Sequence, residues 1–173
     1  MLKVVEKTEI YNFQKVGFVT PDGNHEPHNL GLILLYPLHH REKGVFTPIC
    51  SSEIPAFEAL RPQFEQSKCT VLHATFDIAT KQQEYIRHHL DKKYRNKVLM
   101  LSVPKKYRKD LFKEVQASFE LETRSWVLLH NNTIVAYGRN PIDVSRNPQA
   151  LLQMVQGYVN YEIQGHKCLV ENL

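Results

Sequence analysis

The sequence predicts an α/β fold in which helices flank a central mixed sheet. Short apolar runs alternate with segments of helical periodicity through the first two thirds of the chain, as in parallel β-α-β units. Two strand-like segments then follow each other closely, which indicates an antiparallel edge. The 173 residues suit a single domain, and no repeat or linker divides them. We therefore expect one domain over 1–173, with 160–173 as a mobile C-terminal tail.

Three apolar runs predict the parallel strands. They cover residues 31–36 (GLILLY), 71–76 (VLHATF) and 98–103 (VLMLSV). Runs that are apolar throughout are typical of strands covered on both faces. Pro37 ends the first run, and the polar residues 39–44 are expected to form a loop.

Two further segments, 126–129 and 133–137, predict an antiparallel hairpin. The residues between them include Asn131 and Asn132. Asparagine tolerates the left-handed conformation that tight turns need. The hairpin supplies the antiparallel edge of the predicted sheet.

Helices are predicted over 51–66, 80–92 and 106–115, where apolar residues recur at helical spacing. Pro62 lies inside the first of these and should kink it, because proline removes a helical hydrogen bond. Asn147 is expected to cap a final helix that has Pro148 at its first position. The inner face of that helix is predicted to consist of Leu151, Leu152, Val155 and Val159.

Composition excludes several classes of protein. Hydrophobic residues make up 42% of the chain and charged residues 23%, and no apolar run approaches the roughly 20 residues of a membrane span. The first residues lack the apolar core of a signal peptide, so we expect a cytoplasmic protein. With a net charge of only +4, the basic stretches 92–95 and 105–109 indicate solvated surface rather than a nucleic-acid interface. The pairs His39-His40 and His88-His89 lack a carboxylate or thiol at ligand spacing, so no metal is expected.

Cys50 is the main candidate for chemistry. It lies where an apolar segment gives way to the predicted helix, and a helix N-terminus offers free N–H groups and partial positive charge. Both stabilise a thiolate, which is the nucleophilic form of cysteine. Cys69 opens a predicted strand and is interpreted as a core residue. Taken alone, Cys50 is better interpreted as a buried structural cysteine, and Cys168 as an incidental thiol of the tail.

Four short motifs resemble those of the peroxiredoxin family. Residues 46–53 (FTPICSSE) resemble its active-site loop, Phe-Thr-x-x-Cys-x-x-Glu, and residues 123–129 are similar to the segment that holds its active-site arginine. Residues 142–147, with the helix after them, match the Val-Gly-Arg segment, and 165–168 resembles its Gly-x-x-Cys. The resemblance spans about residues 31 to 168. It implies a thioredoxin-like fold of the peroxiredoxin type, which also fits the element order.

The resemblance implies a role for each matched residue. Cys50 would attack the peroxide, and Cys168 of a partner subunit would resolve the resulting sulfenic acid. Arg124 can stabilise both the thiolate and the charge on the leaving oxygen, because a guanidinium stays charged and offers several donors. Thr47 would orient the peroxide or donate to sulfur. We expect Glu53 to orient Arg124, and Arg146 to add positive potential behind it.

The activity implied is a thiol-dependent peroxidase of the alkyl hydroperoxide reductase C type, reducing hydrogen peroxide and organic hydroperoxides in antioxidant defence. No metal or organic cofactor is expected. The implied partners are a thioredoxin-like or flavoprotein reductant and a second copy of the chain, in a homodimer and possibly a decameric ring. Two alternatives stay open: a single-cysteine peroxidase in which Cys168 is idle, and a non-catalytic holdase or binding protein with the same fold.

The chain also departs from the family pattern. Pro37 lies ten residues before Thr47, where the family usually has four, so 39–44 is interpreted as an insertion in the loop over the site. Ser51 replaces the usual proline after the cysteine. A Gly-Gly-Leu-Gly segment is absent from 101–119 and only five residues follow Cys168, which implies an enzyme resistant to over-oxidation.

Overall fold

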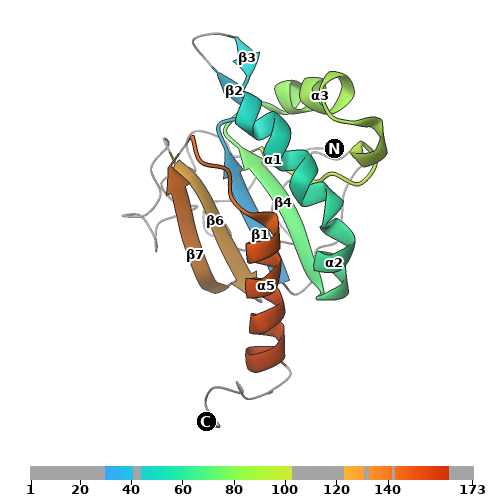
Figure 1. Cartoon of the computed structure of the whole chain (residues 1–173). Coiled ribbons are helices and arrows are strands. Elements are labelled where there is room, and N and C mark those ends of the chain that lie inside the picture. The colour runs from blue at the N-terminus through green and yellow to red at the C-terminus, as the bar shows by residue number, and fades with distance from the viewer. Residues whose placement is uncertain (1–29, 41–43, 103–122, 131–132, 142, 164–173) are drawn as a thin grey trace.

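A five-stranded mixed sheet forms the centre of the computed structural model, which describes residues 30–40, 44–102, 123–130, 133–141 and 143–163 (Figure 1). Its strands are β1 (Leu30–Tyr36), β4 (Cys69–Thr75), β5 (Met100–Ser102), β6 (Thr123–His130) and β7 (Thr133–Pro141). They are ordered β5-β4-β1-β6-β7. β5, β4 and β1 run parallel, whereas β6 and β7 are antiparallel to their neighbours. The predicted α/β fold with a parallel portion and an antiparallel edge is confirmed.

Strand β1 lies at the centre of the sheet. It pairs with β4 from Leu30 opposite Cys69 to Tyr36 opposite Thr75, and with β6 on its other side. Every residue of β1 and β4 is buried, which explains their continuous apolar character. β4 begins two residues before the predicted run, and β5 is shorter than predicted.

Three of the described helices lie on one face of the sheet. They are α1 (Pro48–Ala59), α2 (Arg61–Gln66) and α5 (Pro148–Tyr158) (Figure 1). Asn147 caps α5 as predicted, because its side chain accepts a hydrogen bond from the Ala150 N–H at 3.2 Å. A short π-helical segment, η5 (Val159–Ile163), extends α5. The predicted tail therefore begins with helical residues.

The predicted helix over 51–66 is two helices. It begins at Pro48, three residues earlier than expected, and breaks at Leu60 before α2. Pro62 lies in the first turn of α2, where a missing N–H costs no helical hydrogen bond. α3 (Ala79–His88) ends earlier than predicted and is followed by the 3₁₀ segment η2 (Lys92–Tyr94). The helix expected over 106–115 lies outside the described residues.

The segment before Thr47 differs from the expected polar loop. β2 (His39–His40) and β3 (Val45–Phe46) pair as a small antiparallel hairpin beyond the end of the sheet (Figure 1). The Thr47 N–H donates to the Leu38 carbonyl at 2.7 Å, so the two ends of the hairpin lie close together. Phe46 packs against α3, with ring centroids 5.4 Å from Tyr85 and 4.7 Å from His89. These aromatic contacts hold β3 against the C-terminal part of α3.

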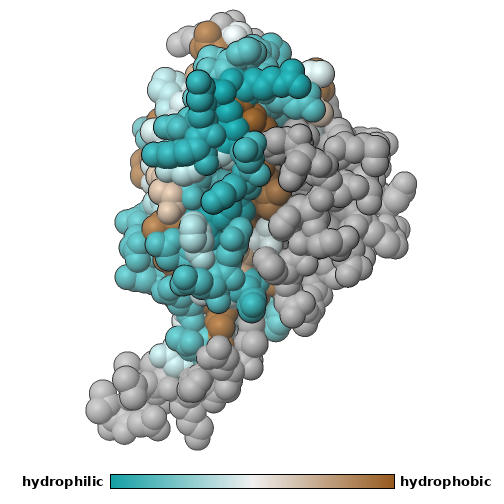
Figure 2. Space-filling model, turned by 90° about the vertical axis from the view of Figure 1, so that its right-hand side faces the viewer, coloured by the Kyte–Doolittle hydropathy of each residue, from teal (hydrophilic) through white to brown (hydrophobic). Residues whose placement is uncertain are grey.

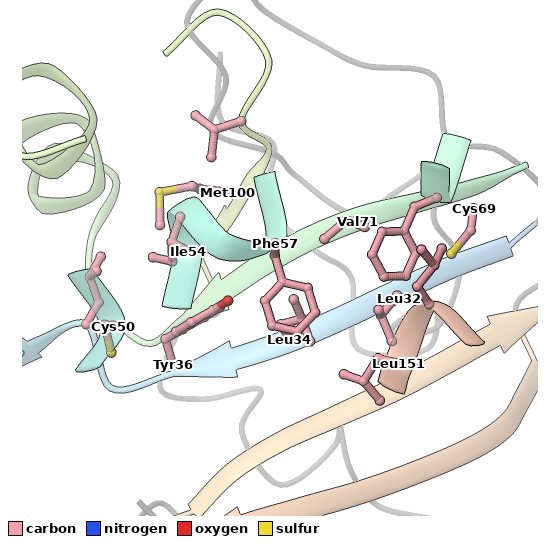
Figure 3. Close-up of a cluster of buried hydrophobic side chains, with 14 of the residues drawn as sticks. Leu32, Leu34, Tyr36, Cys50, Ile54, Phe57, Cys69, Val71, Met100 and Leu151 are labelled. Atoms are coloured by element: carbon pink, nitrogen blue, oxygen red, sulfur yellow. The ribbon is translucent and has the colours of Figure 1, made fainter. Parts of the chain in front are cut away.

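The hydrophobic core lies between the sheet and the helices of that face (Figure 3). β1 and β4 supply Leu32, Leu34 and Val71, and α1 supplies Ile54 and Phe57. On the side that carries α3, the described residues are mostly hydrophilic (Figure 2). Among the described helices, none is both long and apolar enough to cross a membrane.

Candidate active site

Cys50 lies in the first turn of α1 and is fully buried. Thr47 is the N-cap residue, and its hydroxyl oxygen accepts a hydrogen bond from the Cys50 N–H at 3.4 Å. Ser51 strengthens the same turn, because its N–H and its hydroxyl both donate to the Thr47 carbonyl at 3.1 Å. A proline at Ser51 would lack both donors. The thiol therefore sits at a helix N-terminus, as predicted, in a well-bonded turn.

Arg124 brings a positive charge to the Cys50 sulfur. Its guanidinium comes from β6, and Nη1 donates to Cys50 Sγ at 3.3 Å. The Arg124 side chain is only 1% exposed, and it is among the largest fully buried side chains of the described residues. A buried cation is costly unless it faces an anion or acceptors. In this buried site the Cys50 sulfur is an acceptor for the Arg124 guanidinium.

Glu53 pairs with Arg146, a partner that the sequence did not predict. The Arg146 backbone N–H donates to Glu53 Oε2 at 2.8 Å, and Nε donates to Oε1 at 2.7 Å. Arg146 Nη2 also contacts Oε1, and Nη1 donates to the carbonyl of Ser125, the neighbour of Arg124. The fold brings the loop before α5 over the inner side of α1, so Arg146 reaches this carboxylate. Arg146 thus links α1 to β6.

A buried polar network continues from this site, and the sequence analysis did not identify it. Tyr36 lies beneath Arg146, whose guanidinium carbon is 4.5 Å from the ring centroid. The Tyr36 hydroxyl lies 3.0 Å from His73 Nδ1, and His73 Nε2 lies 3.3 Å from Glu58 Oε2. Arg61 Nε donates to Glu58 Oε2 at 2.9 Å. The sequence did carry a signal, because Glu58 and Arg61 fall on the apolar side of a helix and His73 inside an apolar strand.

The charges of this network follow from its surroundings. Burial would raise the pKa of Glu58, but the hydrogen bonds and charges of His73 and Arg61 outweigh burial and lower it. Burial lowers the pKa of His73, against the opposing effect of Glu58. Glu58 is therefore ionised and His73 neutral. Burial also raises the pKa of Tyr36 well above its usual value, so its hydroxyl stays protonated.

Cys69 lies apart from this arrangement. Figure 3 shows Cys69 and Cys50 at opposite ends of the core cluster, and Cys69 pairs with Leu30 at the far end of β1. Burial raises the pKa of Cys69 to about 12, so this thiol stays protonated. Its interpretation as a core residue agrees with its full burial. Cys168 lies outside the described residues.

No group of three His, Cys, Asp or Glu side chains in the described part of the chain is arranged to hold a metal ion. The cation beside the candidate nucleophile is instead a guanidinium. Cys50 and Arg124 together give the site a thiol with a fixed hydrogen-bond donor.

Comparison with known proteins points to the peroxiredoxins. No family model matches the chain. A curated relative, the 1-Cys peroxiredoxin of Dictyostelium discoideum, is 30% identical over 83 residues, which are 44% of this chain and 34% of that protein. The match thus spans about a third of the relative's length.

Several solved peroxiredoxins share the fold. The reduced 2-Cys peroxiredoxin of Plasmodium vivax superposes with a TM-score of 0.66 at 18% identity, covering 87% of this chain and 80% of the other. AhpC of Enterococcus faecalis gives 0.65 at 14% identity, covering 82% and 81%. The yeast mitochondrial 1-Cys peroxiredoxin gives 0.62 at 14% identity, covering 83% and 70%. The chain therefore has the thioredoxin-like fold of the peroxiredoxins, and its neighbours include both one-cysteine and two-cysteine proteins.

Proposed function

We propose that this protein is a thiol-dependent peroxidase with Cys50 as its nucleophile. The observation that carries the proposal is the 3.3 Å contact between Arg124 Nη1 and Cys50 Sγ in the first turn of α1. The fold shared with solved peroxiredoxins supports it, as does the 30% sequence identity with a 1-Cys peroxiredoxin over 83 residues. Hydrogen peroxide and organic hydroperoxides are the proposed substrates.

The chemistry follows from the positions of three residues. The Cys50 thiolate attacks one peroxide oxygen, so an S–O bond forms while the O–O bond breaks. Cys50 is oxidised to the sulfenic acid, and the other oxygen leaves as alkoxide or hydroxide and takes up a proton. Arg124 stabilises the thiolate and then the charge on the leaving oxygen. Thr47 accepts from the Cys50 N–H, so its own hydroxyl proton is available to a peroxide oxygen.

Two routes can return the sulfenic acid to thiol. In the first, Cys168 of a partner subunit condenses with it, forming a disulfide and releasing water. A thioredoxin-like or flavoprotein dithiol then reduces that disulfide, and the assembly is a homodimer or a ring of dimers. In the second, Cys168 is idle and an external thiol reduces Cys50 directly. The 1-Cys peroxiredoxin relative favours this second candidate.

Peroxide consumption tests the activity itself. Purified protein is supplied with hydrogen peroxide or cumene hydroperoxide and with dithiothreitol as electron donor. We expect turnover that Cys50→Ser abolishes and that Cys69→Ala leaves unchanged. Equal peroxide loss in the parent protein and Cys50→Ser would instead favour a non-catalytic protein with this fold.

Non-reducing electrophoresis separates the two routes after one equivalent of hydrogen peroxide. A covalent dimer that disappears in Cys168→Ser supports resolution between subunits. A monomer that carries a Cys50 sulfenic acid in both proteins supports the single-cysteine route.

A further inference from the structure

The two groups that make up the candidate site belong to different elements. Cys50 is on α1 and Arg124 is on β6, so their contact depends on how α1 lies against the sheet. Arg146 holds these elements together, because its guanidinium bonds both Glu53 of α1 and the Ser125 carbonyl of β6. Whatever fixes the guanidinium of Arg146 therefore also fixes the distance between the Cys50 sulfur and Arg124.

The Tyr36 ring is the surface on which this guanidinium lies. The 4.5 Å separation between the Arg146 guanidinium carbon and the ring centroid is that of a cation–π contact. The hydroxyl at the far end of the ring is held by His73 at 3.0 Å. His73 is in turn held by Glu58, a second residue of α1. Tyr36 is thus fixed between two attachment points of the same helix.

The direction of these hydrogen bonds depends on the protonation of His73. An ionised Glu58 only accepts hydrogen bonds, so His73 carries its proton on Nε2 and donates it to that carboxylate. Nδ1 is then an acceptor, and the Tyr36 hydroxyl donates to it. The titratable and charged groups that face His73 are Tyr36 of β1, Glu58 of α1, Arg61 of α2 and Arg146 of the loop before α5.

We propose that Tyr36 and His73 are positioning residues for the Cys50 site. Through Arg146 they hold α1 against β6 at the separation that places Arg124 on the Cys50 sulfur, and they do so while His73 is neutral. The inference rests on the proposed function only in taking Cys50 as the reacting thiol. Neither residue touches the sulfur or a peroxide.

Protonation of His73 breaks this arrangement. Both ring nitrogens become donors, so Nδ1 no longer accepts from the Tyr36 hydroxyl. The new positive charge also repels Arg146 on the other side of the Tyr36 ring. Since burial lowers the pKa of His73, this change occurs at acid pH and the network is intact near neutrality.

Three variants and one control test the inference. Tyr36→Phe keeps the ring under Arg146 and removes only the hydroxyl. His73→Gln keeps a donor for Glu58, has no acceptor at the Nδ1 position and does not titrate. The double variant tests whether the two act together. Tyr94→Phe is the matched control, because Tyr94 is a half-buried tyrosine of η2 outside the network.

Labelling with methyl methanethiosulfonate provides a readout that does not need peroxidase activity. Peptide mass spectrometry follows Cys50 and uses buried Cys69, at the other end of the core, as a reference for global opening. We expect each single variant to increase Cys50 labelling about tenfold at pH 7.5 without labelling Cys69, and to slow a single turnover with hydrogen peroxide by about as much. The double variant should match the single variants, because coupled effects do not multiply.

The pH profile separates positioning from simple loss of structure. The ratio of Cys50 labelling between His73→Gln and the parent should fall toward one as the pH is lowered from 7.5 to 5, because the parent then also loses neutral His73. Any one of four results would overturn the inference. Both single variants could label like the parent, or the ratio could be independent of pH. The effects could multiply in the double variant, or Cys69 could be labelled as much as Cys50. A parent that consumes no peroxide contradicts the proposed function instead. The labelling of Cys50 then still tests whether Tyr36 and His73 position its site.

Discussion

At the scale of single residues, Arg124 places a positive charge beside the Cys50 sulfur. The thiol is buried among apolar side chains, an environment that by itself favours the neutral form. A guanidinium nitrogen 3.3 Å from the sulfur provides the opposing charge. At Cys69 burial outweighs a backbone hydrogen bond with Leu32 and the charge of Arg61, and the pKa of that thiol rises to about 12. Of these two buried cysteines, Cys50 is the one whose sulfur accepts a hydrogen bond from a guanidinium.

Arg124→Lys tests this interpretation. Lysine keeps the positive charge but has neither the planar shape nor the several fixed donors of a guanidinium. We expect the second-order rate constant for hydrogen peroxide to fall about 100-fold, the usual cost of removing a preorganised donor. Stopped-flow measurement of a single oxidation gives this constant. Arg139→Lys, at an exposed position of β7, is the control and should react like the parent; a parental rate in Arg124→Lys would contradict the role given to Arg124.

The partners of the site residues could be predicted from sequence only in part. Cys50, Thr47 and Arg124 were identified because they lie in motifs that resemble known ones, and the structure brings the three together. The pairing of Glu53 with Arg146 was not predicted, because a linear pattern does not show which arginines face a carboxylate. Tyr36 and His73 were missed because each belongs to an apolar strand run that was interpreted only as core.

At the scale of elements, α1 begins one turn earlier than the sequence indicated, and its first turn includes Cys50. Helical periodicity appears only from Ser51 onward, so the predicted helix began after Cys50. Pro48 and the Thr47 cap extend the helix to include the thiol. The break at Leu60 was misplaced for a related reason, since Pro62 suits the first turn of a new helix as well as a kink. Strands β1 and β4 were easier to predict because both faces are apolar.

The end of α2 offers a test of backbone strain. Lys68 is exposed and has φ 59°, a left-handed conformation that costs a residue with a side chain roughly 1 kcal/mol. We expect Lys68→Gly to raise the free energy of unfolding by about 0.5–1 kcal/mol in urea titrations. Gln83→Gly, in the interior of α3, is the matched comparison and should lower it by about 1 kcal/mol. A loss of stability in Lys68→Gly would show that the conformation is not strained.

At the scale of the whole molecule, the buried Glu58–His73 pair makes stability depend on pH. Both groups have a lowered pKa in the folded protein, so the unfolded chain binds more protons than the folded chain at acid pH. Their contribution to the free energy of unfolding is complete at pH values above 6.5, the ordinary pKa of histidine. It is lost as the pH falls, first for His73 and then, below the ordinary Glu value of 4.5, for Glu58 as well.

Thermal unfolding between pH 8 and 4 measures this dependence. We expect the free energy of unfolding to be flat down to about pH 6.5 and then to fall by up to about 1.4 kcal/mol per pH unit for each proton taken up. His73→Gln should remove the part of the decline that begins near 6.5. His88→Gln, at an exposed position of α3, should keep it. Stability that rises on acidification would contradict a neutral, buried His73.

The layout of the whole molecule was more predictable than its details. The chain order of the strands of the central sheet, the antiparallel edge and the cap of α5 all followed from local patterns that the structure confirms. The hairpin at β2 and β3 did not, because Phe46 is stabilised by Tyr85 and His89, contacts that are distant in sequence. Long-range pairing of this kind leaves no periodic signal.

The most direct test of the account is to find which cysteine hydrogen peroxide oxidises first. The protein receives one equivalent of peroxide in the presence of dimedone, which traps sulfenic acids, and its peptides are analysed by mass spectrometry. We expect a dimedone adduct on Cys50 within a single turnover, little or none in Arg124→Lys over the same time, and unmodified Cys69 in both proteins. First oxidation at Cys69, or an equal rate at Cys50 without Arg124, would contradict it.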